Sequence, residues 1–283
     1  MLKSLLLISL AISGSLALVP FNAYTNVCDS NPNCYALFND QSHISIGANY
    51  QSIEAWPQIN PYSNPASNIG FAQSHAQALS YRLWLSRPSN SIQFSVFSEL
   101  SIVKAALKQN YPACKSPTSQ NFDNLPFDSL GNEDTDIYLK PTFPDYTDSS
   151  NWCNTELLDS VDTTGVEGFK FPGYEYRMLA SQSTYEKIKN DLENKGIGLI
   201  TISHDYSMAN GFGFYNNGYY KLNGQGLYNY PANVVGVQKT QSGEVLLLVY
   251  AFGAHHPDTN YLWVKLSDIT SNDSIAYIRN FDY

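Results

Sequence analysis

The sequence predicts an α+β protein in which helices come first and an antiparallel sheet follows. Residues 72–108 carry apolar side chains at helical spacing. Residues 197–278 contain short runs rich in Val, Ile, Leu and aromatic residues, separated by Gly and Asn clusters. Helices that precede the strands, rather than alternating with them, are typical of folds in which the two kinds of element are segregated.

The first predicted helix follows from apolar residues that recur one turn apart: Ala72, Ala76, Leu79 and Leu83. The residues between them are polar and include Gln73, Gln77, Ser80 and Arg82. This pattern predicts an amphipathic helix of about four turns that ends before Pro88. A second helix is predicted over Glu99–Lys108. A third is predicted over Ser183–Lys195, with Ser183 as its N-cap and Gly196 at its C-terminal end.

Five strands are predicted after the third helix, at residues 197–203, 232–237, 245–252, 261–266 and 275–278. Residues 121–168 are different, because they hold eleven acids, one base and several prolines with little periodicity. This stretch is predicted to be a long, solvated loop region. The alternative interpretation is an acidic interaction surface.

The N-terminus has the composition of a secretory signal peptide. Lys3 precedes a mostly apolar run from Leu5 to Leu18, and Ser15-Leu16-Ala17 supplies small residues for cleavage. Residues 1–17 are therefore predicted to be a signal peptide, since the apolar run is too short to span a bilayer comfortably. A retained membrane anchor is the alternative. The expected location is extracellular, or the periplasm or secretory lumen in other hosts.

The net charge of −9, with only 14% charged residues, bears on possible partners. Binding to phosphates requires clustered cations, so neither nucleic acid nor an anionic membrane surface is an expected partner. The oligomeric state is not predicted.

Four cysteines are present, at positions 28, 34, 114 and 153. An even number in a secreted chain favours disulfides, and four cysteines allow three pairings. Proximity in the sequence favours Cys28 with Cys34 and Cys114 with Cys153. No CxxC motif is present and no histidine lies close to a cysteine, so no zinc site or other cofactor is predicted.

Several motifs in the C-terminal part resemble those of papain-like cysteine peptidases. Phe212–Tyr220 is similar to the family element F-x-x-Y-x-x-G-[IV]-[YF]. Tyr230–Val237 is similar to H-A-V-x-x-V-G-Y, with Tyr230 at the position of the catalytic histidine. The terminal Ile275–Arg279 is similar to the last strand of the family.

A further motif, Tyr261–Asp268, is similar to Y-W-x-x-K-N-S-W. Here Leu266 replaces the asparagine that orients the histidine, and Asp268 replaces the tryptophan that shields it.

The N-terminal part resembles the family more weakly but in the same order. Trp56 precedes Tyr62–Phe71, which leads into the first predicted helix as V-K-N-Q-G-S-C-G-S-C-W-A-F-S does in the family. In this alignment Pro65 replaces the oxyanion-hole glutamine and Phe71 replaces the nucleophilic cysteine.

The resemblance implies a papain-like two-lobed fold, with a helical N-terminal lobe near residues 62–180 and a barrel-like antiparallel sheet lobe near residues 183–283. Residues 18–61 would form an extended segment that crosses the lobes. The cleft between the lobes would be the binding surface, lined by Gly70, Phe71, Tyr230 and Trp263.

The same alignment implies a degenerate member of the family, a pseudopeptidase. Phenylalanine has no lone pair with which to attack a carbonyl, and tyrosine, with a pKa near 10, is a poor substitute for imidazole as a general base. Leucine cannot orient an imidazole, and proline offers no side-chain amide to an oxyanion. The expected function is a secreted, inactive papain-like protein that binds a peptide or protein in the cleft or serves as an extracellular scaffold.

Three alternatives stay open. In the first, the alignment is shifted and Phe71, Tyr230 and Leu266 are ordinary core residues. The chain could be an active cysteine peptidase with Cys34 as a displaced nucleophile, which requires a free thiol. Its 21 tyrosines also fit an aromatic-rich structural or glycan-binding protein.

The histidines are predicted to have structural roles. His75 lies near the apolar face of the first helix and is expected to be a hydrogen-bonded core residue. His255-His256 and Asp258 form a conceivable metal site, but adjacent histidines on a strand point to opposite faces, which favours a surface turn. His204 is likewise expected in an exposed turn.

Overall fold

The structure of the chain is a computed structural model. It describes residue 28 and residues 31–37, 69–86, 95–108, 130, 135–140, 142–143, 155–179, 184–204, 215–216, 219–220, 228–251, 261–269 and 274–281. Its helices are α2 (Ile69–Ser86), α3 (Glu99–Lys108), α4 (Thr155–Ser160) and α5 (Tyr185–Lys195), followed by the 3-10 turn η4 (Leu266–Asp268).

The strands that precede α5 are β1 (Cys34–Ala36), β2 (Asp136–Ile137), β3 (Phe169–Lys170) and β4 (Tyr174–Met178). Those that follow it are β5 (Gly198–His204), β6 (Tyr215–Asn216), β7 (Tyr219–Tyr220), β8 (Tyr228–Lys239), β9 (Val245–Ala251), β10 (Tyr261–Lys265) and β11 (Ser274–Ile278). The chain therefore has an α+β fold of helices and a mainly antiparallel sheet, as the sequence predicted.

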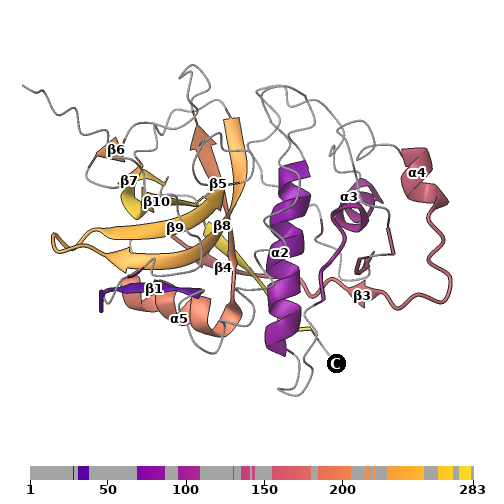
Figure 1. Ribbon diagram of the computed structural model, residues 1–283, viewed down its shortest axis with the longest axis horizontal. Coiled ribbons are helices and arrows are strands. Elements are labelled where there is room, and N and C mark those ends of the chain that lie inside the picture. Colours follow the sequence, from indigo (N-terminus) through magenta and orange to yellow (C-terminus); the bar gives the residue numbers. More distant parts are fainter. Residues whose placement is uncertain are drawn as a thin grey trace, which may run out of the picture.

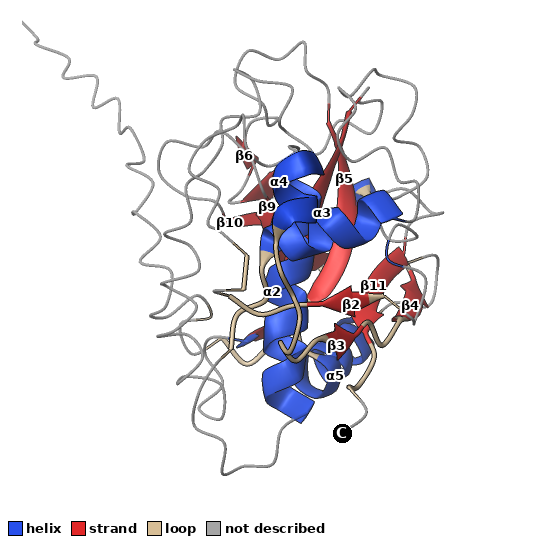
Figure 2. Cartoon of the chain, turned by 90° about the vertical axis from the view of Figure 1, so that its right-hand side faces the viewer, coloured by secondary structure: helices blue, strands red, loops and turns tan. Residues whose placement is uncertain are grey.

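Helix α2 is the middle layer of the molecule (Figure 1). It contacts β8, β5 and β11 of the sheet on one side and α3 on the other. Figure 2, viewed from the side of α3 and α4, shows these two helices in front of α2. The small β2–β3 ladder forms a separate two-stranded sheet.

The main sheet has the strand order β4-β11-β5-β8-β9-β10-β7-β6, with β1 added alongside β8. Neighbouring strands are antiparallel except for β10 and β7. Strand β8 is shared, because Tyr228–Val234 pairs with β5 and Gly236–Gln238 pairs with β1. A register shift between Val234 and Gly236, of the kind that a β-bulge produces, lies where one partner gives way to the other.

Gly236 allows β1 to lie this close to β8. A Cβ atom at this position would be 2.8 Å from the carbonyl oxygen of Tyr35 and 3.1 Å from the side chain of Leu248. Any larger residue would therefore push β1 away from the sheet.

Helix α2 is buried on every side, which corrects the prediction that it is amphipathic. All thirteen residues from Phe71 to Leu83 are buried, and this set includes the residues that were assigned to a polar face. Those residues are Gln73, Gln77, Ser80 and Arg82, and none is more than 7% exposed. Apolar spacing alone identified the helix but not its environment, since the covering elements come from distant parts of the chain.

Polar side chains of α2 are hydrogen-bonded to those covering elements. Ser80 donates to the carbonyl of Ala76 and accepts from the amide of Phe97, just before α3. Arg82 donates to the carbonyl of Asn194 in the last turn of α5, where a cation complements the helix dipole.

The other predicted helices are confirmed, with one correction. Helix α3 has the predicted bounds, and α5 ends at Gly196, whose φ of 83° is the left-handed value expected of a helix-terminating glycine. The N-cap of α5 is Thr184 rather than Ser183, and its side chain accepts from the amide of Lys187. A hydroxyl one residue later makes the same capping bond, so the sequence did not distinguish the two.

All five predicted strands are present, as β5, β8, β9, β10 and β11. Two further strands of the same sheet lie outside the predicted sheet region of residues 183–283. Strand β4 pairs with β11, and β1 comes from the segment predicted to be merely extended. Strand β4 includes Glu175 and Arg177 and lacks the apolar run by which β10 and β11 were predicted, and the three residues of β1 are too few to show a period.

The acidic stretch at residues 121–168 is more ordered than predicted where the structure describes it. It contains α4 and β2, and β2 pairs with β3 just beyond it. Lys104 of α3 donates to the carbonyl of Leu158 at the end of α4, which joins the two helices. Short elements of this kind depend on such tertiary contacts rather than on their own propensity.

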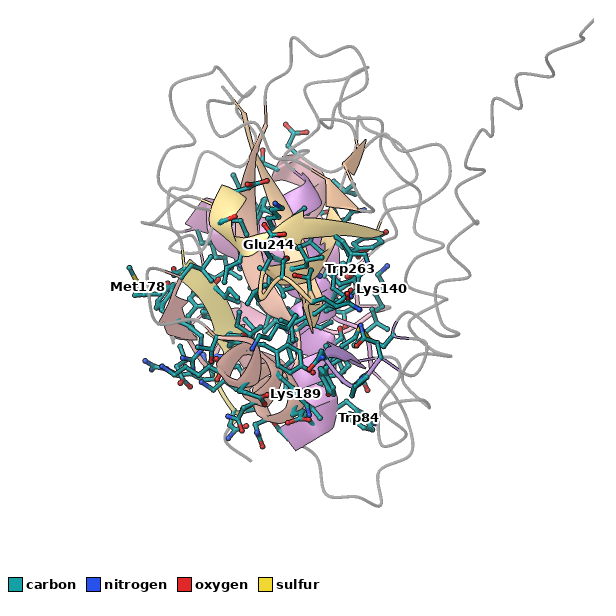
Figure 3. The ribbon with its side chains drawn as sticks, turned by 90° about the vertical axis from the view of Figure 1, so that its left-hand side faces the viewer. Trp84, Lys140, Met178, Lys189, Glu244 and Trp263 are labelled. Carbon is teal, nitrogen blue, oxygen red and sulfur yellow. A yellow bond between two sulfur atoms is a disulfide. The ribbon has the colours of Figure 1, made fainter. Side chains whose placement is uncertain are left out.

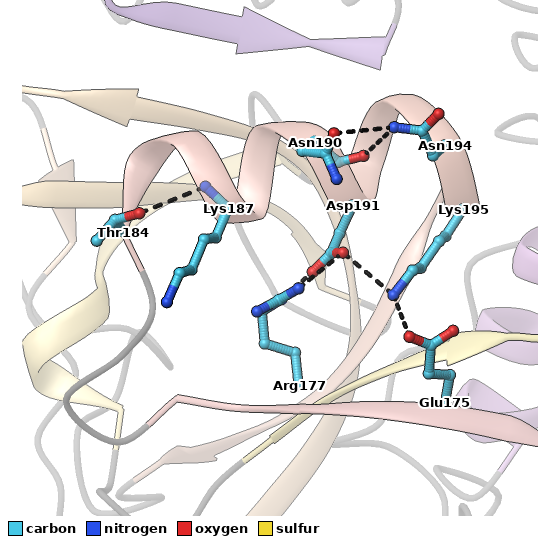
Figure 4. Close-up of polar contacts among 8 residues, drawn as sticks. All are labelled: Glu175, Arg177, Thr184, Lys187, Asn190, Asp191, Asn194 and Lys195. Carbon is cyan, nitrogen blue, oxygen red and sulfur yellow. Dashed lines mark hydrogen bonds and ion pairs between the residues drawn. The ribbon is translucent and has the colours of Figure 1, made fainter.

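A network of charged side chains attaches β4 to α5 (Figure 4). Asp191 is 1% exposed and accepts from Arg177 of β4, with an Nη2–Oδ1 distance of 2.9 Å. Lys195 lies 3.1 Å from Asp191 and also pairs with Glu175. The bond to Asp191 raises the pKa of Arg177, and burial raises the pKa of the neighbouring Tyr277. The buried carboxylate is thus compensated by two cations, as a buried charge requires.

Candidate functional site

The first turns of α2 hold the residue that the resemblance assigns to the nucleophile. Phe71 is the third residue of the helix, and its side chain is 3% exposed. Its ring meets that of His75 edge to face, with the centroids 6.0 Å apart. Because the ring is buried hydrocarbon, this position offers neither a nucleophile nor an acid or base.

His75 is one turn further along α2 and is fully buried, as the sequence predicted for a hydrogen-bonded core histidine. Its Nδ1 lies 2.7 Å from the carbonyl oxygen of Phe71, and its Nε2 lies 2.7 Å from the hydroxyl of Tyr174 on β4. A carbonyl only accepts, so Nδ1 carries the proton. Nε2 is then the acceptor, and the Tyr174 hydroxyl donates to it.

Burial lowers the pKa of His75 from its ordinary value of 6.5 to about 4, while the bond to the Phe71 carbonyl acts in the opposite direction. The imidazole is therefore neutral at pH 7. It joins the first turns of α2 to strand β4 across 99 residues of sequence.

A second group of buried polar side chains, the amide cluster, joins the same turns of α2 to strand β8. It consists of Ser74, Gln77 and Asn233. The hydroxyl of Ser74 donates to Oδ1 of Asn233 at 2.6 Å, and Nδ2 of Asn233 donates to Oε1 of Gln77 at 2.7 Å. Nδ2 also lies 3.4 Å from the carbonyl of Ser74. Asn233 is 0% exposed, so its amide is satisfied by protein groups in the core.

These groups do not form a nucleophile–base pair. The Ser74 proton goes to an amide oxygen rather than to an imidazole, and the acceptor nitrogen of His75 already takes the Tyr174 proton. A serine or cysteine nucleophile needs a base that accepts its proton, and this base needs a third group that orients it. In the described part of the chain, the polar groups of α2 hold the helix in place and are not arranged for acyl transfer.

The remaining predicted site residues are only partly described. Gly70 belongs to the first turn of α2, and Tyr230 belongs to β8, where its backbone pairs with Ile202. Trp263 on β10 and Leu266 in η4 are half-buried and pack against the hydrophobic core. Pro65 lies outside the described residues. That these positions border one binding cleft stays a prediction.

Strand β10 is separated from β8 only by β9. Neighbouring strands lie about 4.8 Å apart, so the backbones of β8 and β10 are roughly 10 Å apart. The backbone of Trp263 pairs with that of Leu248 on β9, so Trp263 lies on the strand two places along the sheet from β8.

The predicted pairing of Cys28 with Cys34 is confirmed, since the two form a disulfide and Cys34 is the first residue of β1. Cys34 is therefore not a free thiol. Cys114 and Cys153 lie outside the described residues, as do His255, His256 and Asp258.

Within the described ranges, no group of three or more His, Cys, Asp or Glu side chains is arranged to hold a metal ion. Within the same ranges, no helix combines the length and apolar character needed to cross a bilayer.

Sequence reasoning missed Ser74, Asn233 and Tyr174. One signal was available for Asn233, which interrupts an otherwise apolar strand segment, Ala232–Val237. A polar residue at a buried strand position requires a partner. The sequence does not say that Ser74 and Gln77, 159 and 156 residues away, are those partners.

Comparisons with known proteins leave the family undecided. No protein-family model matches the chain. No curated protein matches it either. One matching solved structure was reported in work on antibody cross-reactivity between the mite allergens Blo t 1 and Der p 1, with a TM-score of 0.41 and 15% identity. The match covers 74% of this chain and 64% of that one, just under two thirds of its length. A similarity at this level does not establish a fold family.

The amide cluster generates a stability prediction. Asn233→Ala would leave the Ser74 hydroxyl and the Gln77 amide oxygen without their partner and would open a small cavity. We expect the free energy of unfolding to fall by about 2–4 kcal/mol. Urea unfolding followed by tryptophan fluorescence measures the change. Gln238→Ala, at a half-buried position of the same strand, is the matched control and should change stability by about 0.5 kcal/mol or less. Equal effects of the two substitutions would contradict the assignment.

Proposed function

We propose that this chain is a secreted, papain-like protein without peptidase activity, which binds a peptide or another protein in a cleft between its sheet and its helical part. The observation that carries the proposal is the start of α2. There, the position that the resemblance assigns to the nucleophile is a phenylalanine that is 3% exposed. Inactivity follows from chemistry, because no step of acyl transfer begins without a nucleophile.

The arrangement of elements supports the papain-like part of the proposal. A long helix lies between a sheet and a second group of helices, and its N-terminal turns face β8, the strand that carries Tyr230. The glycine of the family's V-x-x-V-G motif corresponds to Gly236. A glycine is required at this position because β1 lies too close to leave room for a side chain. These features fit the two-lobed architecture that the resemblance implies.

The alternative of a displaced nucleophile is not supported. Cys34 is bonded to Cys28, and a thiol in a disulfide cannot attack a carbonyl. The glycan-binding alternative depends on exposed aromatic faces. In the described part of the chain, Tyr176 is the only aromatic side chain among the exposed large hydrophobic residues, so this alternative gains nothing from the structure.

Inactivity is tested by incubating the intact, oxidised protein with a fluorogenic peptide and with unfolded casein between pH 4 and pH 8. We expect no hydrolysis above buffer, with or without dithiothreitol, and no alkylation of Cys28 or Cys34 by iodoacetamide before reduction. Hydrolysis that iodoacetamide abolishes would overturn the proposal. If that activity disappeared in Cys34→Ser, the displaced-nucleophile alternative would be established instead.

The alignment itself is tested by a pair of engineered cysteines. If Phe71 and Tyr230 stand at the family's nucleophile and histidine positions, Phe71→Cys with Tyr230→Cys should form a disulfide, which requires Cα atoms within about 7 Å. Peptide mapping without reduction detects the link. Phe71→Cys with Thr240→Cys is the control. Residue 240 follows Tyr230 by ten positions along β8 and the turn after it, so it lies roughly 30 Å from Tyr230. A link in the control, or none in the test pair of a folded protein, would contradict the alignment.

Peptide binding is tested at Trp263, which lies near the middle of the view in Figure 3, whereas Trp84 lies near its lower end. Both rings are half-buried, which makes Trp84→Ala a matched control for Trp263→Ala. With fluorescently labelled, unfolded peptides as probes, we expect Trp263→Ala to weaken binding about tenfold or more, because aromatic anchors dominate binding energy. Binding that is equally affected by both substitutions, or by neither, would argue against the cleft.

A further inference from the structure

His75 joins helix α2 directly to strand β4. On one side it bonds to the carbonyl of Phe71 in the first turns of α2, and on the other to the hydroxyl of Tyr174 on β4. The three rings meet edge to face, since the Phe71 and Tyr174 centroids lie 6.0 and 5.9 Å from that of His75. Phe171 packs against Tyr174 in turn, with a centroid distance of 4.8 Å.

One of the two hydrogen bonds of the ring, in which Nε2 accepts from the Tyr174 hydroxyl, depends on the ring being neutral, whereas Nδ1 donates to the Phe71 carbonyl in either charge state. Protonation turns Nε2 into a donor, so the Tyr174 hydroxyl no longer has that nitrogen as its acceptor. The hydroxyl must rotate to accept instead, and its own proton loses the bond it had. These two partners, a carbonyl and a hydroxyl, are neutral, and the ring is 0% exposed, so protonation places a charge in the core at a cost in free energy.

We propose that Phe71, His75 and Tyr174 form an acid-sensitive switch that fixes the first turns of α2 to strand β4 when His75 is neutral and releases them when it is protonated. Release here means local opening, in which the imidazolium reaches water while the rest of the sheet stays folded. This inference concerns the coupling of α2 to β4 and does not rest on the proposed function.

Several charged groups of the surrounding elements are paired with other groups. These pairs are Glu99 with Lys140, Lys104 with the Leu158 carbonyl, Glu175 with Lys195, Arg177 with Asp191, and Arg82 with the Asn194 carbonyl. Glu175 and Arg177 alternate with Tyr174 along β4 and so point to the opposite face of the strand. Tyr277 of β11 belongs to the same group as Asp191 and Arg177. Lys239 lies at the far end of β8, six residues beyond Asn233. None of these groups contributes to the pKa of His75, which is set by burial and by the Phe71 carbonyl.

The direction of the effect follows from linkage. The pKa of His75 in the closed state is about 4, below the 6.5 of an exposed histidine, so the open state binds more protons. The closed state is therefore fully favoured above pH 6.5 and loses its advantage as the pH falls towards 4. Between pH 7.5 and pH 5 these two values predict an increase in the open-to-closed ratio of about 30-fold.

Hydrogen–deuterium exchange of the full chain at pH 7.5 and pH 5, corrected for the intrinsic exchange rates, tests the proposal. Protection should fall about 30-fold in peptides covering residues 71–79 and 174–178, and much less in the β9 peptide, residues 245–250. His75→Gln, which keeps a donor and an acceptor but does not titrate, should abolish the difference. Ser80→Ala, which removes a non-titrating bond of the same helix, should leave the difference intact.

A second measurement needs no variant. Exchange of the histidine C2 hydrogen in the wild-type protein, read from the peptide that contains His75, should give a pKa near 4. A value near 6.5 would overturn the proposal, because the ring would then not be held in the closed site. An equal loss of protection in all peptides, or a pH dependence that persists in His75→Gln, would also overturn it.

Discussion

A helix that is covered on every side must obtain partners for its polar side chains from whatever covers it, and α2 obtains them from four separate parts of the chain. Asn233 of β8, Tyr174 of β4, the end of α5 and the amide of Phe97 each meet a different side chain of the helix. A donor or acceptor left unsatisfied in such a site costs about 1–3 kcal/mol. The position and rotation of α2 are therefore specified by hydrogen bonds as well as by apolar packing, and the elements around it are ordered relative to one another through the helix.

The same buried contacts determine which groups are available at the candidate site. The turns to which the resemblance assigns the nucleophile are held by an imidazole bonded to a carbonyl and a phenol, and by an amide cluster that reaches the sheet. An enzyme needs an accessible reactive atom at such a place, whereas here the space is filled by the ring of Phe71. The buried ring of Phe71 therefore has two effects: it offers no atom for acyl transfer, and it fills the space beside the first turns of α2.

Local signals were enough to predict most elements. Helix α3 and the strands β5, β8, β9, β10 and β11 follow from runs of apolar residues, and the end of α5 follows from Gly196. What the sequence did not reveal depends on contacts between distant residues. The polar face assigned to α2 is buried because α3, α5 and the sheet cover it, and β1 and β4 are strands only because β8 and β11 pair with them. In the site, His75 was recognised as a core residue, but its bond to Tyr174 spans 99 residues and has no local signature.

The double use of β8 has a consequence for how the chain can be shortened. Residues 34–36 complete the sheet beside residues 236–238, so the sheet is complete only when two segments about 200 residues apart in the sequence have paired. A fragment that starts at residue 62 would lack β1. The backbone amides and carbonyls of residues 236–238 that pair with β1 would then face solvent, and Gly236 has no side chain to cover them. Exposed strand edges of this kind recruit other chains and promote aggregation. The N-terminal strand is therefore part of the minimal folding unit.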